Sequence, residues 1–207
     1  MKLDETERNL AYSYVDNAYK QYYQGDIESV DENLSLSVAI FKEFLKPENK
    51  KTFLFVDDFD KLEDIAQLYK KLKFYNKSIE AFELAGCRHE IGNIYYDNLK
   101  DYASAQLYFL SDVGTPSSQF KLGLMHWKGH GTRQDNIEAL KWFNISNFTS
   151  NSNDMDIYIA EIKKVMTHDE IDQSNSLFKA LKEEITKTNK KIEKSTQMWK
   201  KLGNKIL

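Results

Sequence analysis

The histidines include one pair whose spacing suggests metal chemistry. His126 and His130 lie four residues apart, as two zinc ligands on one face of a helix do. Gly129 and Gly131 flank the second histidine, and glycines at this spacing favour a loop over a continuing helix. The two imidazoles are therefore not expected to share a face, and the sequence predicts no metal site here.

Cys87 and His89 form a second pair of potentially reactive residues. No motif places an acid beside them, and a lone thiol of this kind is more often an inert packing residue than a nucleophile. The Gly-x-Gly segment at residues 129–131 lacks the preceding strand, the later glycine and the Lys-Ser/Thr that nucleotide-binding loops have. It is expected to serve loop geometry and to bind no phosphate.

The acidic cluster Asp57, Asp58 and Asp60 is the last candidate for chemistry, and a solvated turn accounts for it. No nucleophile, base and orienting group stand at recognisable offsets anywhere in the chain. The sequence therefore predicts no catalytic residue, no metal, no cofactor, no small-molecule substrate and no enzymatic activity.

The composition favours helices as the elements that position these residues. Only 8 Gly and 2 Pro occur among 207 residues, less than half of the roughly 12% usual in soluble proteins, which argues against a turn-rich β fold. The single cysteine cannot form an internal disulfide. The first twenty residues lack a signal peptide pattern and no run of eighteen apolar residues occurs, so we expect a cytoplasmic protein without a membrane span.

Apolar residues recur at steps of three and four along most of the chain, the period of amphipathic helices. Ser29 and Glu32 have the spacing of a capping box and are expected to open the second helix. The apolar run 53–56 is too short to assign. The predicted helical pairs, all within a repeat domain of residues 1–150, span residues 5–45, 61–86, 88–113 and 117–147.

Residues 118–147 carry the most specific pattern in the chain. Its special positions are Leu122, Gly123, Gly129, Gly131, Asp135, Ala139, Trp142 and Phe143. At these offsets the segment closely resembles the Sel-one-like repeat, a relative of the tetratricopeptide repeat. The resemblance, together with the short helices, implies an all-α, right-handed α-solenoid of helix-turn-helix repeats with a long C-terminal helix. We expect Gly123 to face Ala139 across the helical pair and Asp135 to cap the second helix.

In tetratricopeptide-like arrays the first helix of each repeat lines a concave groove, and the resemblance points to one stripe on each of three such helices. The stripes are Glu63, Gln67 and Lys70; His89, Asn93 and Tyr96; and Phe120, Leu124 and Trp127. The last stripe is apolar, and two interpretations stay open. It is either core beneath a helix near residues 157–166 or an open patch that marks a partner site.

Residues 154–207 are expected to form C-terminal capping helices with a basic tail. Thr167 and Glu170 have capping-box spacing, and residues 187–207 hold seven Lys against one Glu. The long helix either caps the repeats or protrudes as a basic helix toward a partner. Its apolar residues recur every seven positions, at Ile171, Phe178, Ile185, Ile192, Trp199 and Ile206.

The predicted function is a non-enzymatic protein–protein interaction module that binds a partner protein or peptide in the groove of the repeats. The family resemblance implies adaptor, scaffold or signalling roles, which are common among its bacterial members. One alternative is an immunity or inhibitor protein that occludes one cognate toxin or enzyme. A lesser alternative is binding of nucleic acid or an anionic surface through the basic C-terminal helix, which a net charge of −3 disfavours for the chain as a whole.

Overall fold

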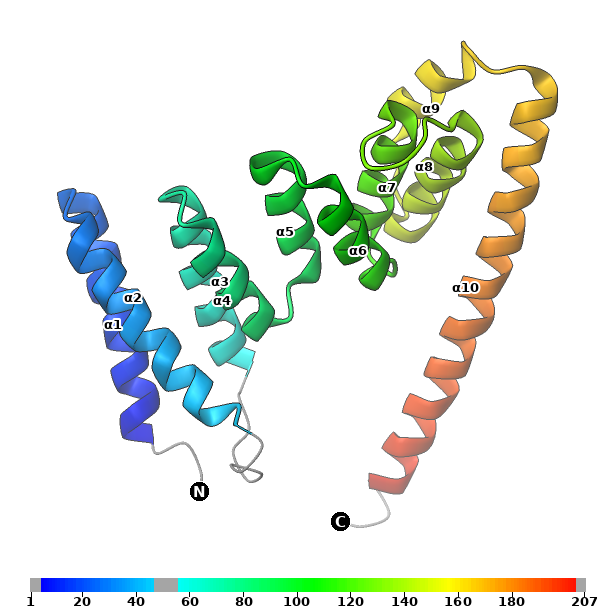
Figure 1. Ribbon diagram of the computed structural model, residues 1–207. Coiled ribbons are helices and arrows are strands. Elements are labelled where there is room, and N and C mark those ends of the chain that lie inside the picture. The colour runs from blue at the N-terminus through cyan, green and yellow to red at the C-terminus, as the bar shows by residue number, and fades with distance from the viewer. Residues whose placement is uncertain (1–4, 47–55, 204–207) are drawn as a thin grey trace. The chain divides into compact units, whose positions relative to one another are not determined.

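The computed structural model describes residues 5–46 and 56–203, and most of these residues are helical (Figure 1). No strand occurs in these two ranges, which confirms the prediction of an all-α chain. No helix within them is both long and apolar enough to cross a membrane. The helices are α1 (Glu5–Gln24), α2 (Ile27–Phe44), α3 (Val56–Lys71), α4 (Tyr75–Ala85), α5 (Arg88–Asn93), the π-helix η2 (Ile94–Leu99), α6 (Tyr102–Ser111), α7 (Pro116–Lys128), α8 (Asn136–Ser150), α9 (Asp156–Lys163) and α10 (His168–Gly203).

The chain forms two compact units, Met1–Lys100 and Asp101–Leu207. Unit 1 contains the antiparallel hairpins α1/α2 and α3/α4, followed by α5 and η2. Unit 2 contains α6, the hairpin α7/α8, α9 and α10. The boundary divides the predicted pair 88–113 between the two units. That pair, and the predicted domain limit near residue 150, stay predictions.

Helix α2 begins one turn earlier than Ser29. The Asp26 side chain accepts a hydrogen bond from the Ser29 backbone N–H at 3.2 Å, and Asp26 is the N-cap. The prediction that Ser29 opens this helix is wrong, because a carboxylate three residues upstream is a strong N-cap that also complements the helix dipole. Gly25, with φ +81°, makes the turn from α1 into α2.

Asp58 joins the first two hairpins of unit 1. Its side chain is fully buried in the first turn of α3, where Oδ1 accepts hydrogen bonds from Arg8 Nε at 2.8 Å and the Tyr12 hydroxyl at 2.9 Å. The expected solvated turn at residues 57–60 is therefore wrong, because this acidic run starts a helix that packs on α1. Two donors and an opposite charge offset the cost of burying the carboxylate.

The hairpin α7/α8 follows the predicted repeat chemistry. The Asp135 side chain accepts a hydrogen bond from the Glu138 N–H at 2.9 Å and caps α8. Gly129 and Gly131 adopt φ of +69° and +71°, so the loop uses backbone conformations that glycine favours. A Cβ on Gly123 would lie 2.6 Å from two ring carbons of Phe143, so the closest partner of this glycine lies one turn beyond the predicted Ala139.

The C-terminal helix α10 opens with the predicted capping box. Thr167 N–H donates to Glu170 Oε2 at 2.8 Å, and Glu170 N–H donates to Thr167 Oγ1 at 3.3 Å. The helix packs against α8, and the buried Ser174 hydroxyl donates to the Ile137 carbonyl at 2.9 Å. Of the predicted seven-residue series, the side chains of Ile192 and Trp199, and all of Ile206, lie outside the described residues.

Candidate protein interaction surface

The two histidines with metal-like spacing lie in different structural settings. His126 is half-buried on α7, and burial lowers its pKa below the ordinary value. His130 follows the end of α7, where its ring stacks on Tyr102 with centroids 4.5 Å apart. Across residues 5–46 and 56–203, no group of three or more His, Cys, Asp or Glu side chains could hold a metal ion.

Cys87 lies at the N-terminus of α5 and contacts α3. Its Sγ is 3.7 Å from Glu63 Oε2, a distance that suits a weak thiol–carboxylate hydrogen bond. A carboxylate beside a thiol disfavours the thiolate, which is the reactive form of cysteine. The contact therefore joins α5 to α3.

The first two predicted stripes meet on one face of unit 1, which we call the α3–α5 face. A second contact between the helices is the ion pair of Lys70 Nζ with Glu90 Oε2 at 2.9 Å. The sequence analysis missed Glu90, although its charge opposite to that of Lys70 was the available signal. The predicted members of this face are half-exposed: Glu63, Gln67 and Lys70 on α3, and His89 and Asn93 on α5.

Two carboxamides on the α3–α5 face have no hydrogen-bond partner among the described residues. Gln67 lies one turn before Lys70, and Asn93 lies one turn after Glu90. The Asn93 Oδ1 atom is buried and accepts no hydrogen bond from the described residues. The Gln67 carboxamide can donate and accept at once, which matches the alternating groups of a peptide backbone.

Tyr96, the last residue of the second predicted stripe, differs from its neighbours in exposure. It lies in the π-helix η2, and only 7% of its surface is exposed. Lys100, with φ +56°, follows this helix in a left-handed conformation. The accessible part of the second stripe is thus polar, and its aromatic member is buried.

The third predicted stripe lies in unit 2 beneath α9. The Tyr158 ring makes edge contacts with Phe120 at 4.9 Å and with Trp127 at 6.2 Å between centroids. These residues and Leu124 pack against a buried cluster that includes Phe143. Phe120, Leu124 and Trp127 are each partly buried, and α9 packs over them, so the geometry favours core over an open patch.

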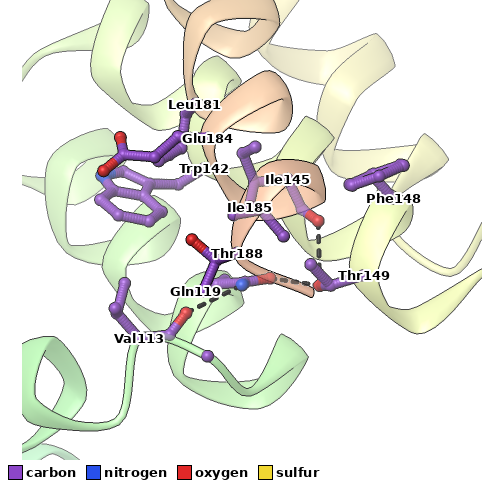
Figure 2. A pocket seen from close by; sticks show the side chains of 11 residues that line it. Val113, Gln119, Trp142, Ile145, Phe148, Thr149, Leu181, Glu184, Ile185 and Thr188 are labelled. Carbon is purple, nitrogen blue, oxygen red and sulfur yellow. Dashed lines mark hydrogen bonds between the residues drawn. The ribbon is translucent and has the colours of Figure 1, made fainter. Parts of the chain in front are cut away.

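Unit 2 also holds a pocket that the sequence analysis did not predict. It has a volume of about 570 Å³ and opens between α8 and α10 (Figure 2). The only signal in the sequence was the seven-residue series of α10, which includes Ile185. The lining residues are Val113, Gly114, Gln119, Trp142, Ile145, Phe148, Thr149, Leu181, Glu184, Ile185 and Thr188.

Comparisons with known proteins give one structural likeness. No family model and no curated protein matches the chain. The chain is similar in structure to a protective antigen present in uropathogenic Escherichia coli strains that displays an SLR fold, with 17% sequence identity and a TM-score of 0.49. The match covers 79% of this chain and 39% of that protein, so the chain spans about two fifths of its length.

Proposed function

We propose that this protein is an interaction module and that its α3–α5 face binds an extended segment of a partner protein or peptide. The supporting observation is the pair of carboxamides, Gln67 and Asn93, on neighbouring helices without protein partners. A peptide backbone crossing the two helices would hydrogen-bond to the Gln67 carboxamide and to the amino group of Asn93, whose Oδ1 atom is buried. Glu63 and Lys70 flank Gln67 on the same stripe and would orient the side chains of the bound segment.

The charges on this face largely neutralise one another. Lys70 is paired with Glu90, and His89 Nε2 lies 3.6 Å from the other oxygen of the same carboxylate. Recognition would therefore depend on hydrogen bonding and shape more than on long-range attraction. We expect the affinity for a bound peptide to change little with salt concentration.

Selection of a displayed random-peptide library on the purified protein tests this proposal. Affinities of the selected peptides are then measured by calorimetry for the native protein and for a Gln67→Ala/Asn93→Ala variant. Loss of two hydrogen bonds of about 0.5–1.5 kcal/mol each predicts a roughly 5- to 150-fold weaker affinity. Asn76→Ala is the matched control, because Asn76 is an exposed amide on α4 of the same unit and should have no effect.

Two results would contradict the proposal: selected peptides that bind the double variant as tightly as the native protein, or no selected peptide at all. The immunity or inhibitor alternative would use the same face but requires one tight partner and weak binding to all others. Binding of nucleic acid through residues 187–207 would show affinity that falls steeply with salt. Both alternatives stay predictions.

A further inference from the structure

The pocket in unit 2 lies between two facing apolar stripes. Leu181 and Ile185 of α10 stand across from Trp142, Ile145 and Phe148 of α8 (Figure 2). The polar lining groups on the α7/α8 side bond to protein: Gln119 Nε2 donates to the Val113 carbonyl at 2.8 Å, and the Thr149 hydroxyl donates to Gln119 Oε1. A group that enters this pocket would therefore make mainly apolar contacts.

The pocket lies farther along α8 and α10 than the hydrogen bond that joins them near the start of α10. Near its start α10 touches α8 directly, through the hydrogen bond from Ser174 to the Ile137 carbonyl. Thr188, about four turns after Ser174 on α10, and Thr149, about three turns after Ile137 on α8, both line the pocket. The two helices run in the same direction, and the space between them is wide enough to admit side chains from another element.

The apolar series of α10 continues where α8 has ended. Helix α8 ends at Ser150, whereas α10 continues for fifteen residues beyond Thr188 to Gly203, about 22 Å of helix. In the sequence, Ile192 and Trp199 continue the seven-residue recurrence over this distal part. Such a recurrence is typical of a helix that pairs with another helix.

We propose that the distal part of α10 from a second copy of this chain occupies the pocket, with the two α10 helices antiparallel and centred on residue 192. A twofold axis there makes each copy fill the pocket of the other. Position 199 of one copy then falls opposite Ile185 of the other, at the pocket. The proposal goes beyond the function of the α3–α5 face and does not depend on it.

Charge complementarity selects the antiparallel direction. The pocket segment of α10 carries Glu183 and Glu184, both exposed, and the distal part of the sequence carries Lys200 and Lys201. Antiparallel pairing centred on residue 192 sets positions 184 and 183 opposite positions 200 and 201. The same register sets Lys190 opposite Lys194, so one like-charge pairing stands against these two of opposite sign. A parallel pair would set each glutamate position opposite itself, which opposes association.

Cysteine cross-linking of the full chain, in a Cys87→Ser background, tests the register. Ile192→Cys alone should form a disulfide-linked dimer under mild oxidation. Ile185→Cys and Trp199→Cys should each remain largely monomeric alone and should cross-link when the two variants are mixed. Cross-linking of Ile185→Cys with itself would indicate a parallel pair and overturn the proposal, as would the absence of any cross-link.

Sedimentation of the full chain over a range of concentrations provides a second measurement. We expect a monomer–dimer equilibrium that Glu184→Lys weakens by roughly threefold or more, since each dimer contains two such pairs. The double variant Glu184→Lys/Lys200→Glu should restore the native dissociation constant. Lys163→Glu on α9 is the control for a charge reversal outside α10 and should leave association unchanged.

A monomer at every concentration, or a double variant that associates no better than Glu184→Lys, would overturn the proposal. Circular dichroism of each variant establishes that its helices are formed. Loss of peptide binding at the α3–α5 face without loss of the dimer would affect the proposed function alone, so the two proposals fail separately.

Discussion

In unit 1, helix α1 contacts α3 through a buried carboxylate, whereas in unit 2 helix α9 contacts α7 through aromatic rings. Asp58 accepts hydrogen bonds from Arg8 and Tyr12, which are directional and admit one register. Tyr158 meets Phe120 and Trp127 edge-on, and such contacts depend mainly on apolar area. Removing one partner of a buried polar contact leaves the other without a hydrogen bond, so most of the stabilisation is lost. Truncating one ring of an aromatic contact loses stabilisation in proportion to the apolar area that is no longer buried.

The difference extends to the exposed face of each first helix. On α3, Gln67 is half-exposed and its amide has no partner in the described structure, so this face is available to another molecule. On α7, Leu124 is partly buried and packs against a cluster that includes Ile162 of α9. The two hairpins thus differ in the chemistry of the first helix, which carries a polar stripe in α3 and an apolar stripe packed against α9 in α7.

The largest expected effect comes from removing the buried carboxylate of unit 1. Asp58→Ala should lower the free energy of unfolding by about 3–5 kcal/mol, because Arg8 and Tyr12 would lose their buried acceptor. Asp57→Ala is the matched control, since Asp57 is exposed in the same helical turn. Urea denaturation of both variants measures the difference. A change of less than about 1 kcal/mol for Asp58→Ala would show that the ion pair contributes little to unit 1.

Removing the aromatic cover of unit 2 should have a smaller effect. Tyr158→Ala should cost about 2–3 kcal/mol, below the usual loss for a fully buried aromatic residue, because Tyr158 is half-buried. Exposure of Trp127 to water should also move tryptophan fluorescence to longer wavelength. Ile157→Ala on the same helix, at a residue 74% exposed, should change neither property. An unchanged emission spectrum in Tyr158→Ala would argue against α9 as the cover of this stripe.

The smallest expected effect is a loss of unit 1 stability at alkaline pH. Burial raises the pKa of Tyr69 to about 12, and burial, with the nearby Asp58 adding to it, raises the pKa of Tyr12 well above its ordinary value. Because the unfolded chain ionises near pH 10 and the folded chain does so later, stability is retained below about pH 10 and falls as pH rises toward about 12.

Urea denaturation at about pH 8 and about pH 11 should show that the free energy of unfolding is lower at the higher pH. The contribution of Tyr69 to this decrease should be about 1 kcal/mol. Tyr69→Phe should reduce this pH dependence, although it also removes the 3.0 Å hydrogen bond to Ser35. Tyr23→Phe is the control, because Tyr23 is 81% exposed. Equal pH dependence in both variants would contradict the role of burial.

Much of the helical fold follows from local features of the sequence. The recurrence of apolar residues at three and four positions places the helices, since this period is a property of one helix alone. Thr167 with Glu170, Asp135, and the glycines at 129 and 131 also act within a few residues of themselves. Each of these predictions agrees with the structure for that reason.

Apart from the N-cap of α2, where Asp26 takes the place predicted for Ser29, the misplaced predictions concern contacts between distant residues. Asp58 resembled a surface acid because its partners, Arg8 and Tyr12, lie 50 and 46 residues away. The α3–α5 face was predicted stripe by stripe, but the pairing of Lys70 with Glu90 required the two helices to be brought together. Tyr158 likewise carried no local sign that it would cover the stripe on α7.

Most helix positions, caps and loop glycines could be predicted from the sequence, because the hydrogen bonds and backbone conformations that set them act within one or two turns. Burial of Asp58, coverage of Phe120 and Trp127, and the pocket beside Ile185 arose only when separate helices packed together. The reason is physical: hydrogen bonding and apolar contact between helices depend on which faces meet in space, and one-dimensional spacing does not carry that information.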